Sequence, residues 1–154
     1  MSTIHATCIA FGKVGVLIRG PSGSGKSSLA LRLIDGEGYG LGDKKLKATL
    51  VGDDQVLLWV DRKRLGATPA PQLAGLIEVR GLGILSAAYK RRVQIKLVVD
   101  LMPAASIPRL PEEGFDTVEL EGISVPRIAL DATAAPAPAA LRAALSKVRQ
   151  KRKP

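Results

Sequence analysis

The chain has 154 residues, of which 46% are hydrophobic, 24% charged and 3% aromatic. This composition is typical of one folded domain with an aliphatic core, and it excludes a disulfide-built fold because Cys8, expected to be buried, is the only cysteine. The net charge of +9 favours an anionic partner such as a nucleotide, a nucleic acid or an acidic protein surface.

Membrane and secretory signals are not recognisable in the sequence. No apolar run approaches the roughly 20 residues that cross a bilayer. Residues 1–11 lack the basic start and the cleavage site of a signal peptide. We therefore expect a cytoplasmic protein without a membrane partner.

The first third of the chain predicts two strands and a helix. Residues 4–11 and 14–19 are apolar runs that flank a tight turn at Gly12–Lys13. Residues 26–35 have the apolar spacing of a buried helix, and Gly36 is placed to end it.

The remaining chain predicts further strands and one terminal helix. A glycine-rich connection at 36–45 leads to these elements, and a charged turn is expected at 61–64. We expect strands at 48–52, 55–60 and 93–101, one or two strands within 115–130, loops at 66–75 and 102–114, and helical spacing from 136 to the basic C-terminus.

Residues 20–27, GPSGSGKS, match the phosphate-loop pattern G-x-x-x-x-G-K-[ST] in full, with an apolar strand before and a helix after. Glycines let backbone N–H groups turn toward phosphate oxygens, and a helix N-terminus adds partial positive charge. Lys26 would hold the β- and γ-phosphates, and the Ser27 hydroxyl would reach Mg²⁺. The expected nucleotide-binding residues are Gly20, Pro21, Ser22, Gly23, Ser24, Gly25, Lys26 and Ser27.

The fold class that follows is α/β, a single P-loop domain with a strand-rich mixed sheet and a helix after the phosphate loop. We expect a catalytic unit at 1–135 and a helix with a basic tail at 136–154.

Four further residues carry ionisable groups that could lie near this loop. Asp53 and Asp54 follow an apolar strand; one could hold the metal through water and the other accept a proton, and because neighbours on an extended chain diverge, we expect one to reach the phosphate. His5 lies on the strand expected to pair with residues 14–19, which could place it near the γ-phosphate, where an imidazolium could stabilise charge. Glu78 lies in an apolar run and needs a metal or a partner, for which Arg80 is a candidate.

In this order, residues 5–31, the segment LVGDDQV at 50–56 and the segment IEVRGLGI at 77–84 resemble the catalytic domain of HPr kinase/phosphorylase. The resemblance covers roughly residues 4–101 and rests most on EVRGLG, which is more specific than the phosphate loop. It implies a core related to phosphoenolpyruvate carboxykinase and a hexameric assembly.

The resemblance implies an ATP- and Mg²⁺-dependent enzyme of carbohydrate regulation that phosphorylates a serine of HPr, the phosphocarrier of the bacterial sugar phosphotransferase system, and removes it by phosphorolysis. By motif match, Lys26 would hold phosphate, and Ser27 with Glu78 would hold Mg²⁺. Asp54 would accept the serine proton, and His5 takes the place of the active-site histidine. The chain looks like a short form that lacks the N-terminal domain.

The chain departs from the family's pattern near its end. Residues 123–145 contain no Gly-Arg pair where the family carries one, and Arg127 is not assigned that role.

Two other functions stay open. A small-molecule P-loop kinase would need arginines in its lid, yet residues 36–47 offer only lysines. A nucleotide-binding regulatory module would bind without phosphotransfer. Nucleic acid is not indicated, because no aromatics interleave the basic residues.

Overall fold

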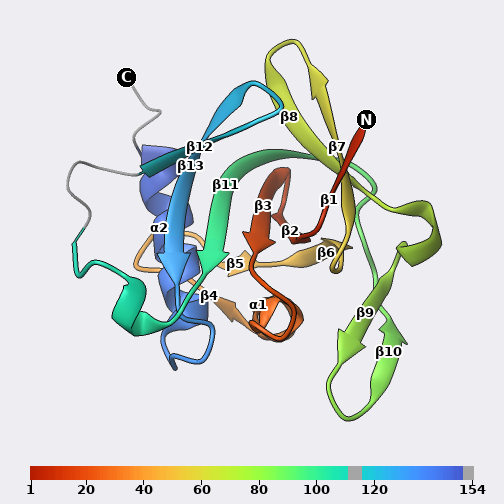
Figure 1. The fold of residues 1–154 in the computed structure, drawn as a ribbon. Helices are drawn as coiled ribbons and strands as arrows, with labels where there is room; N and C mark the ends of the chain where they lie inside the picture. Colours follow the sequence, from red (N-terminus) through yellow and green to blue (C-terminus); the bar gives the residue numbers. More distant parts are fainter. Residues whose placement is uncertain (111–115, 151–154) are drawn as a thin grey trace.

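The computed structural model describes residues 1–110 and 116–150, so residues 151–154 of the expected basic tail lie outside the described part. Nine strands of the described part form one sheet in the order β1-β7-β8-β11-β3-β2-β6, with β13 also pairing β11 and β12 pairing β13 (Figure 1). Their bounds are β1 Ser2–Ile4, β2 Thr7–Phe11, β3 Val14–Arg19, β6 Thr49–Gly52, β7 Val56–Asp61, β8 Arg64–Pro69, β11 Val93–Leu101, β12 Asp116–Leu120 and β13 Ile123–Leu130.

Shorter elements complete the described part. One two-stranded sheet joins β4 and β5, and another joins β9 and β10. These elements, with the helices and 3₁₀ turns, are β4 Glu37–Gly38, β5 Leu46–Lys47, β9 Leu76–Val79, β10 Gly83–Ser86, α1 Lys26–Asp35, α2 Ala137–Gln150, η1 Pro71–Leu73 and η2 Ala104–Ser106.

Strand β11 organises the sheet. It runs parallel to β3 along one edge and parallel to β13 along the other, while its first residues pair antiparallel with β8. The carboxyl ends of three adjacent parallel strands therefore meet at one end of the sheet, the place where α/β folds present ligand sites. The phosphate loop follows β3 at this end.

The sheet is buried on both faces. Along β3, Val16 and Ile18 belong to a core cluster shared with both helices, whereas Leu17 belongs to a second cluster. That second cluster is built from sheet residues, including Leu58 and Leu65 of the β7–β8 pair. Because successive side chains of a strand point to opposite faces of the sheet, the strands contribute residues to both cores. The cores are mostly aliphatic, as expected from the scarce aromatics.

Several predicted elements are confirmed. Strands 14–19 and 93–101 and helix 26–35 have the predicted bounds. The backbone N–H of Gly36 donates to the carbonyl of Arg32 and ends α1. Cys8 is fully buried, and burial raises the pKa of its thiol. The segment 115–130 forms two strands from Asp116 onward.

Other predictions of local structure were wrong. The single strand expected at 4–11 is two strands, β1 and β2, with His5 and Ala6 between them, because β1 pairs with β7 whereas β2 pairs with β3 and β6. A loop was expected at 66–75, but its first four residues, 66–69, belong to strand β8. The glycine-rich connection contains β4, which pairs with β5.

The packing of Trp59 explains why β8 resembles a loop in sequence. A Cβ atom on Gly66 would lie 1.9 Å from Cζ2 of Trp59, so only glycine fits beneath this ring. The indole N–H donates to Thr68 Oγ1 at 3.1 Å, and the Arg92 guanidinium lies 3.5 Å from the centre of the ring. Glycine is required here by a cross-strand neighbour and does not mark a turn.

Candidate functional site

The phosphate loop curls tightly between β3 and α1 (Figure 1). Gly23 and Gly25 have φ values of +81° and +98°, in the left-handed region that favours glycine. The N–H of Ser24 donates to the carbonyl of Pro21 at 3.0 Å. The predicted motif therefore has the strand–loop–helix context that a phosphate-binding loop requires, with Pro21, Ser22 and Gly23 exposed at its tip.

Unpartnered polar groups show that this loop fits a phosphate group. No side chain caps the N-terminus of α1 at Gly25, and the buried hydroxyl of Ser24 has no hydrogen-bond partner. A Cβ atom on Gly20 would lie 2.4 Å from that hydroxyl, so the glycine is needed for this close approach. Free donors at a helix N-terminus are the groups that bind phosphate oxygens.

Lys26 lies inside the loop and is 5% exposed. Its ammonium donates to the carbonyl oxygens of Gly20 at 2.8 Å and Pro21 at 3.2 Å, and lies 3.9 Å from Oδ1 of Asp54. The two close partners are neutral carbonyls. An anionic phosphate oxygen is a stronger acceptor for an ammonium group, so it can replace them.

Asp53 is the centre of the hydrogen-bond network, and it is 7% exposed. Its Oδ1 accepts hydrogen bonds from the Ser27 hydroxyl at 2.6 Å and the Thr7 hydroxyl at 2.9 Å. Its Oδ2 accepts from the backbone N–H of Glu78 at 3.0 Å. This one carboxylate therefore joins the start of α1, strand β2 and strand β9.

Asp54 turns the other way, as expected for adjacent acids. Its φ of +65° is left-handed, and its N–H donates to Thr7 Oγ1 at 3.1 Å. Its exposed carboxylate lies 2.6 Å from Nε2 of His5 and near the ammonium of Lys26. The structure thus brings together His5, Asp54 and Lys26. The imidazole of His5 and the carboxylate of Asp54 are open to an incoming molecule, and the ammonium of Lys26 lies buried behind them.

Glu78 joins the site through its backbone. It lies in β9 opposite Ile84 of β10, with an exposed side chain, and its N–H is held by Asp53. The described residues contain no group of three or more His, Cys, Asp or Glu side chains that could hold a metal ion. Oxygens of Ser27 and Asp53 fit Mg²⁺, which typically binds one or two protein oxygens together with substrate phosphates.

Arg127 is held in a separate network on the opposite face of the sheet. Its Nε donates to Asp100 at 2.6 Å, and Nη1 lies 3.5 Å from Oδ2 of Asp116. Arg19 donates to the same Asp100 carboxylate through two nitrogens, at 2.8 and 2.9 Å. Burial raises the pKa of Asp100, but the hydrogen bonds and charges of the two arginines outweigh it and lower that pKa overall.

Sequence reasoning did not identify the central place of Asp53 in the candidate site, the contribution of Thr7 or this arginine network. Asp53 was considered only as half of a pair, and Thr7 was not considered. The signal for Asp53 was its place at a strand end beside a loop that ends in GKS. For Thr7 no signal existed, because a buried threonine in an apolar strand looks like any other core residue.

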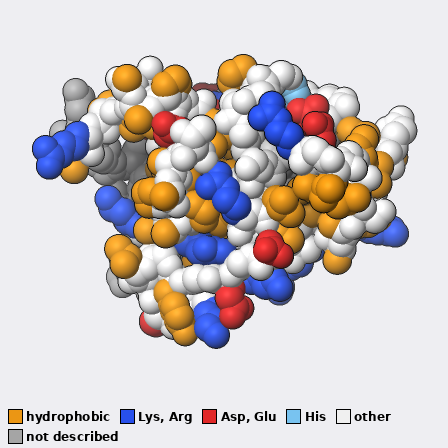
Figure 2. All heavy atoms as spheres, turned by 90° about the horizontal axis from the view of Figure 1, so that it is seen from below, with side chains coloured by type: hydrophobic (Ala, Val, Ile, Leu, Met, Phe, Trp, Pro, Cys, Tyr) orange, Lys and Arg blue, Asp and Glu red, His pale blue; other side chains and the backbone are white. Residues whose placement is uncertain are grey.

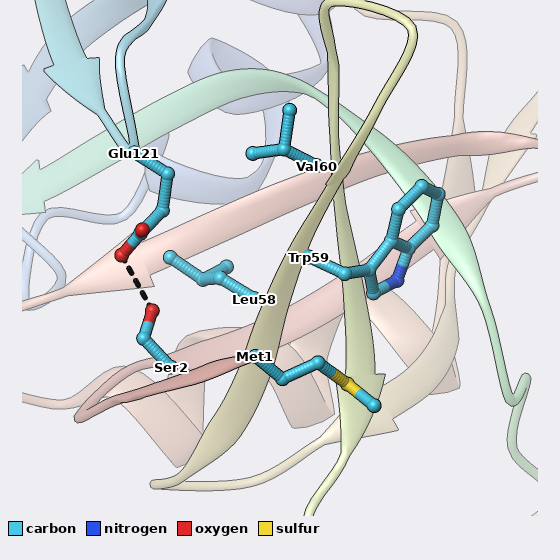
Figure 3. Close-up of a pocket in the computed structure, with 6 residues that line it drawn as sticks. All are labelled: Met1, Ser2, Leu58, Trp59, Val60 and Glu121. Carbon is cyan, nitrogen blue, oxygen red and sulfur yellow. Dashed lines mark hydrogen bonds between the residues drawn. The ribbon is translucent and has the colours of Figure 1, made fainter.

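An open hollow of about 460 Å³ lies away from the phosphate loop (Figure 3). It is lined by Met1, Ser2, Leu58, Trp59, Val60 and Glu121. The Ser2 hydroxyl donates to the Glu121 carboxylate across it. None of the predicted site residues reaches it, so the hollow does not extend the site.

None of the helices in the described part is long and apolar enough to cross a membrane. The chain is similar to known proteins over most of its length. It is 35% identical over 147 residues to HPr kinase/phosphorylases of Burkholderia lata and Burkholderia cenocepacia. Each alignment covers 86% of this chain and 41% of the relative, so the chain spans less than half the length of these curated relatives.

A solved structure supports the same relationship over nearly the whole chain. The Hpr(Ser) kinase/phosphatase of Coxiella burnetii matches with a TM-score of 0.80 and 27% identity, covering 98% of both chains. The predicted α/β fold, strand-rich and mixed, is confirmed. A family model, the HPr Serine kinase C-terminal domain, matches residues 1–153. The chain therefore belongs to the HPr serine kinase C-terminal domain family.

Proposed function

We propose that this chain transfers the γ-phosphoryl group of ATP to a serine of the phosphocarrier protein HPr. The observation that carries the proposal is the meeting of His5, Lys26 and Asp54 at the mouth of a phosphate loop whose Ser27 is held by Asp53. Membership of the HPr serine kinase family supports HPr as the substrate.

Asp54 is the group that would accept the proton of the serine hydroxyl. Its carboxylate is exposed, so a hydroxyl on another protein can reach it, and the left-handed backbone directs it away from Asp53. His5 lies 2.6 Å from it and would hold the carboxylate in place while the proton moves. In the reverse, phosphorolytic direction, Asp54 would return that proton.

Lys26, Ser27 and the N-terminus of α1 would hold the phosphates. ATP with Mg²⁺, when bound, supplies the phosphoryl group and neutralises part of its charge. Lys26 would exchange the carbonyls of Gly20 and Pro21 for phosphate oxygens. Ser27 and Asp53 would hold Mg²⁺, with Glu78 of the neighbouring strand as the further ligand that the family resemblance implies.

The physiological setting is part of the same proposal. A kinase and phosphorylase of HPr would act in the cytoplasm, in the regulation of carbohydrate metabolism, and would assemble from several copies of the chain. We also propose a functional division at 1–135 and 136–154, with catalysis in the first part.

The direct test is incubation of the protein with ATP, Mg²⁺ and purified HPr, followed by mass analysis of the HPr serine. We expect one phosphate on HPr, none when Mg²⁺ is chelated, and a strongly reduced amount with Asp54→Asn. Unmodified HPr in the presence of bound ATP would overturn the kinase proposal.

One observation favours a second function, a nucleotide-binding regulatory module without phosphotransfer. Arg127 is held by Asp100 and Asp116 and so does not replace the family's late arginine. If the chain is such a module, titration would show that it binds ATP with the affinity usual for a nucleotide-binding protein. Neither HPr nor any member of a panel of nucleotides and sugars would become phosphorylated.

A further inference from the structure

The hydroxyl group of Thr7 links the two adjacent acids of the candidate site. Thr7 is the first residue of β2, and it is fully buried. Its hydroxyl donates to Oδ1 of Asp53 at 2.9 Å and accepts the backbone N–H of Asp54 at 3.1 Å. A hydroxyl can donate one hydrogen bond and accept another at the same time, which an aliphatic side chain of the same shape cannot do.

The backbone at Asp54 is strained and needs such a contact. The N–H of Gln55 donates to the carbonyl of Asp53 at 2.7 Å, which closes a three-residue turn with Asp54 at its centre. The φ of Asp54 is +65°, and a three-residue turn with a positive φ at its centre is rare and strained. Strained backbone persists where the surrounding contacts hold it. The Thr7 hydroxyl is the contact that holds the N–H of Asp54 itself.

This turn determines where the carboxylate of Asp54 lies. That carboxylate lies 2.6 Å from Nε2 of His5 and 3.9 Å from the Lys26 ammonium, whereas Asp53 points inward to the Ser27 hydroxyl. A change of φ at Asp54 would turn its side chain relative to Asp53. The distance between the proposed proton acceptor and the proposed metal-binding group therefore depends on the turn that Thr7 holds.

Thr7 acts on the site from beneath its surface. Figure 2 views the molecule from the end of the sheet where β3 and β11 finish, and it shows acidic and basic side chains side by side on that surface. The side chains of His5 and Asp54 are 56% and 62% exposed, whereas Thr7 is fully buried. Any effect of the Thr7 hydroxyl on a bound molecule is therefore transmitted by Asp53 and Asp54.

We infer that Thr7 is a positioning residue for phosphoryl transfer. Its hydroxyl fixes the carboxylate that would accept the serine proton relative to the carboxylate that would help to hold Mg²⁺. This inference rests on the proposed function and adds to it how the two acids keep their relative positions. Phosphoryl transfer depends mainly on positioning and electrostatics, so loss of the hydroxyl should slow transfer more than it weakens binding.

The test compares three variants of the full chain. Thr7→Val keeps the shape of the side chain and removes the hydroxyl, whereas Thr7→Ser keeps the hydroxyl. The matched control, Thr49→Val, changes the same atoms in a half-buried threonine of β6, the strand that pairs with β2. Within the described part of the chain, the Thr49 hydroxyl makes no hydrogen bond.

Three measurements are made on each variant, and thermal unfolding checks folding. Steady-state phosphorylation of HPr gives kcat and KM, and calorimetric titration gives the affinity for ATP·Mg²⁺. Amide hydrogen exchange, followed by NMR without nucleotide, reports directly on the hydrogen bond of the Asp54 N–H. The exchange measurement does not depend on activity.

We expect Thr7→Val to lower kcat by about 10- to 100-fold, with KM for HPr and affinity for ATP·Mg²⁺ within a few-fold of the parent. The Asp54 amide should exchange about tenfold faster or more in Thr7→Val, because its acceptor is lost. Thr7→Ser and Thr49→Val should stay close to the parent in both turnover and exchange.

The outcomes separate this inference from the kinase proposal. Parental kcat in Thr7→Val would overturn the inference and leave the kinase proposal standing. Equal losses of kcat in Thr7→Val and Thr7→Ser, with unchanged exchange at Asp54, would show an effect of packing and would overturn it as well. A parent that binds ATP and leaves HPr unmodified would overturn the kinase proposal, and the role of Thr7 in transfer with it.

Discussion

At the end of the sheet where β3 and β11 finish, the cationic side chains on the two faces have different kinds of partner. On the face covered by α1, the Lys26 ammonium has two neutral carbonyls as close partners and an exposed carboxylate at 3.9 Å. On the other face, Arg19 and Arg127 share the partly buried carboxylate of Asp100. The first cation can exchange its partners for a ligand, whereas the other two are fixed in place.

This difference separates a binding group from a structural one. A guanidinium bound at two nitrogens to a carboxylate is oriented and expensive to separate, because both charges would be left unpaired in a partly buried site. The ammonium of Lys26 gives up only hydrogen bonds to carbonyls. We therefore expect changes at Lys26 and Asp54 to affect activity, and changes at Asp100 to affect stability.

The largest effect is expected for Lys26→Ala. The variant removes the cation that would face the β- and γ-phosphates, so phosphoryl transfer to HPr should fall by about 10³-fold or more. Transfer is measured by mass analysis of HPr at fixed times. Circular dichroism serves as the control for folding, and a well-folded Lys26→Ala protein with parental transfer would remove the phosphate-loop mechanism.

Asp54→Asn should have the next largest effect. The amide keeps the shape and can still bond to His5, but it cannot accept the serine proton, so transfer should fall by about 10²- to 10⁴-fold. Affinity for ATP should stay within a few-fold of the parent in calorimetric titration. If turnover is unchanged, Asp54 is not the base.

Asp100→Asn should lower stability and leave nucleotide affinity close to that of the parent. The change leaves two arginines without their shared carboxylate, and partial exposure limits the cost to about 2 kcal/mol of unfolding free energy. Urea unfolding measures it, with Asp43→Asn on an exposed turn as a matched control. A loss of ATP affinity without loss of stability would place Asp100 in the binding machinery and break the comparison.

The smallest effect is the pH dependence of that stability difference. The pKa of Asp100 is lowered in the folded protein, so its contribution is fully present above the ordinary aspartate pKa of about 4 and is lost as the pH falls through the folded value. The difference between parent and Asp100→Asn should be constant from about pH 5 to 7 and should shrink below about pH 4. Asp131, whose pKa is lowered by hydrogen bonds from Thr133, titrates in both proteins and cancels. A difference that grows toward acid pH would contradict the assignment.

The parts of the site that were predictable from sequence are local. Residues 14–35 form strand, loop and helix as predicted, because the glycines, Lys26 and the apolar flanks act within one short segment. Asp53 and Asp54 diverge as expected, although they lie in a bend after β6 and the left-handed backbone of Asp54, not strand alternation, separates them. Chain order and motif chemistry were sufficient for the strand, the loop and the helix.

The parts that were not predictable depend on distant pairing. Asp53 joins residues separated from it by 46, 26 and 25 positions, namely Thr7, Ser27 and Glu78. The break of the first strand at His5 depends on β1 pairing with β7. Position 66 of strand β8 is a glycine because the ring of Trp59 in the paired strand β7 occupies the space of a side chain. The residues around each position in the sequence do not identify these distant partners.

The shared carboxylate of Asp53 has a thermodynamic consequence. It accepts hydrogen bonds from the serine that would contact the metal and from the backbone of Glu78 in β9, so a movement of this carboxylate when the metal binds would act on both. Such coupling is reciprocal: if loading the nucleotide tightens the grip on the protein substrate by some factor, the substrate tightens the grip on the nucleotide by the same factor. The side chain of Asp53 would then couple the binding of the nucleotide to the binding of the protein substrate before phosphoryl transfer.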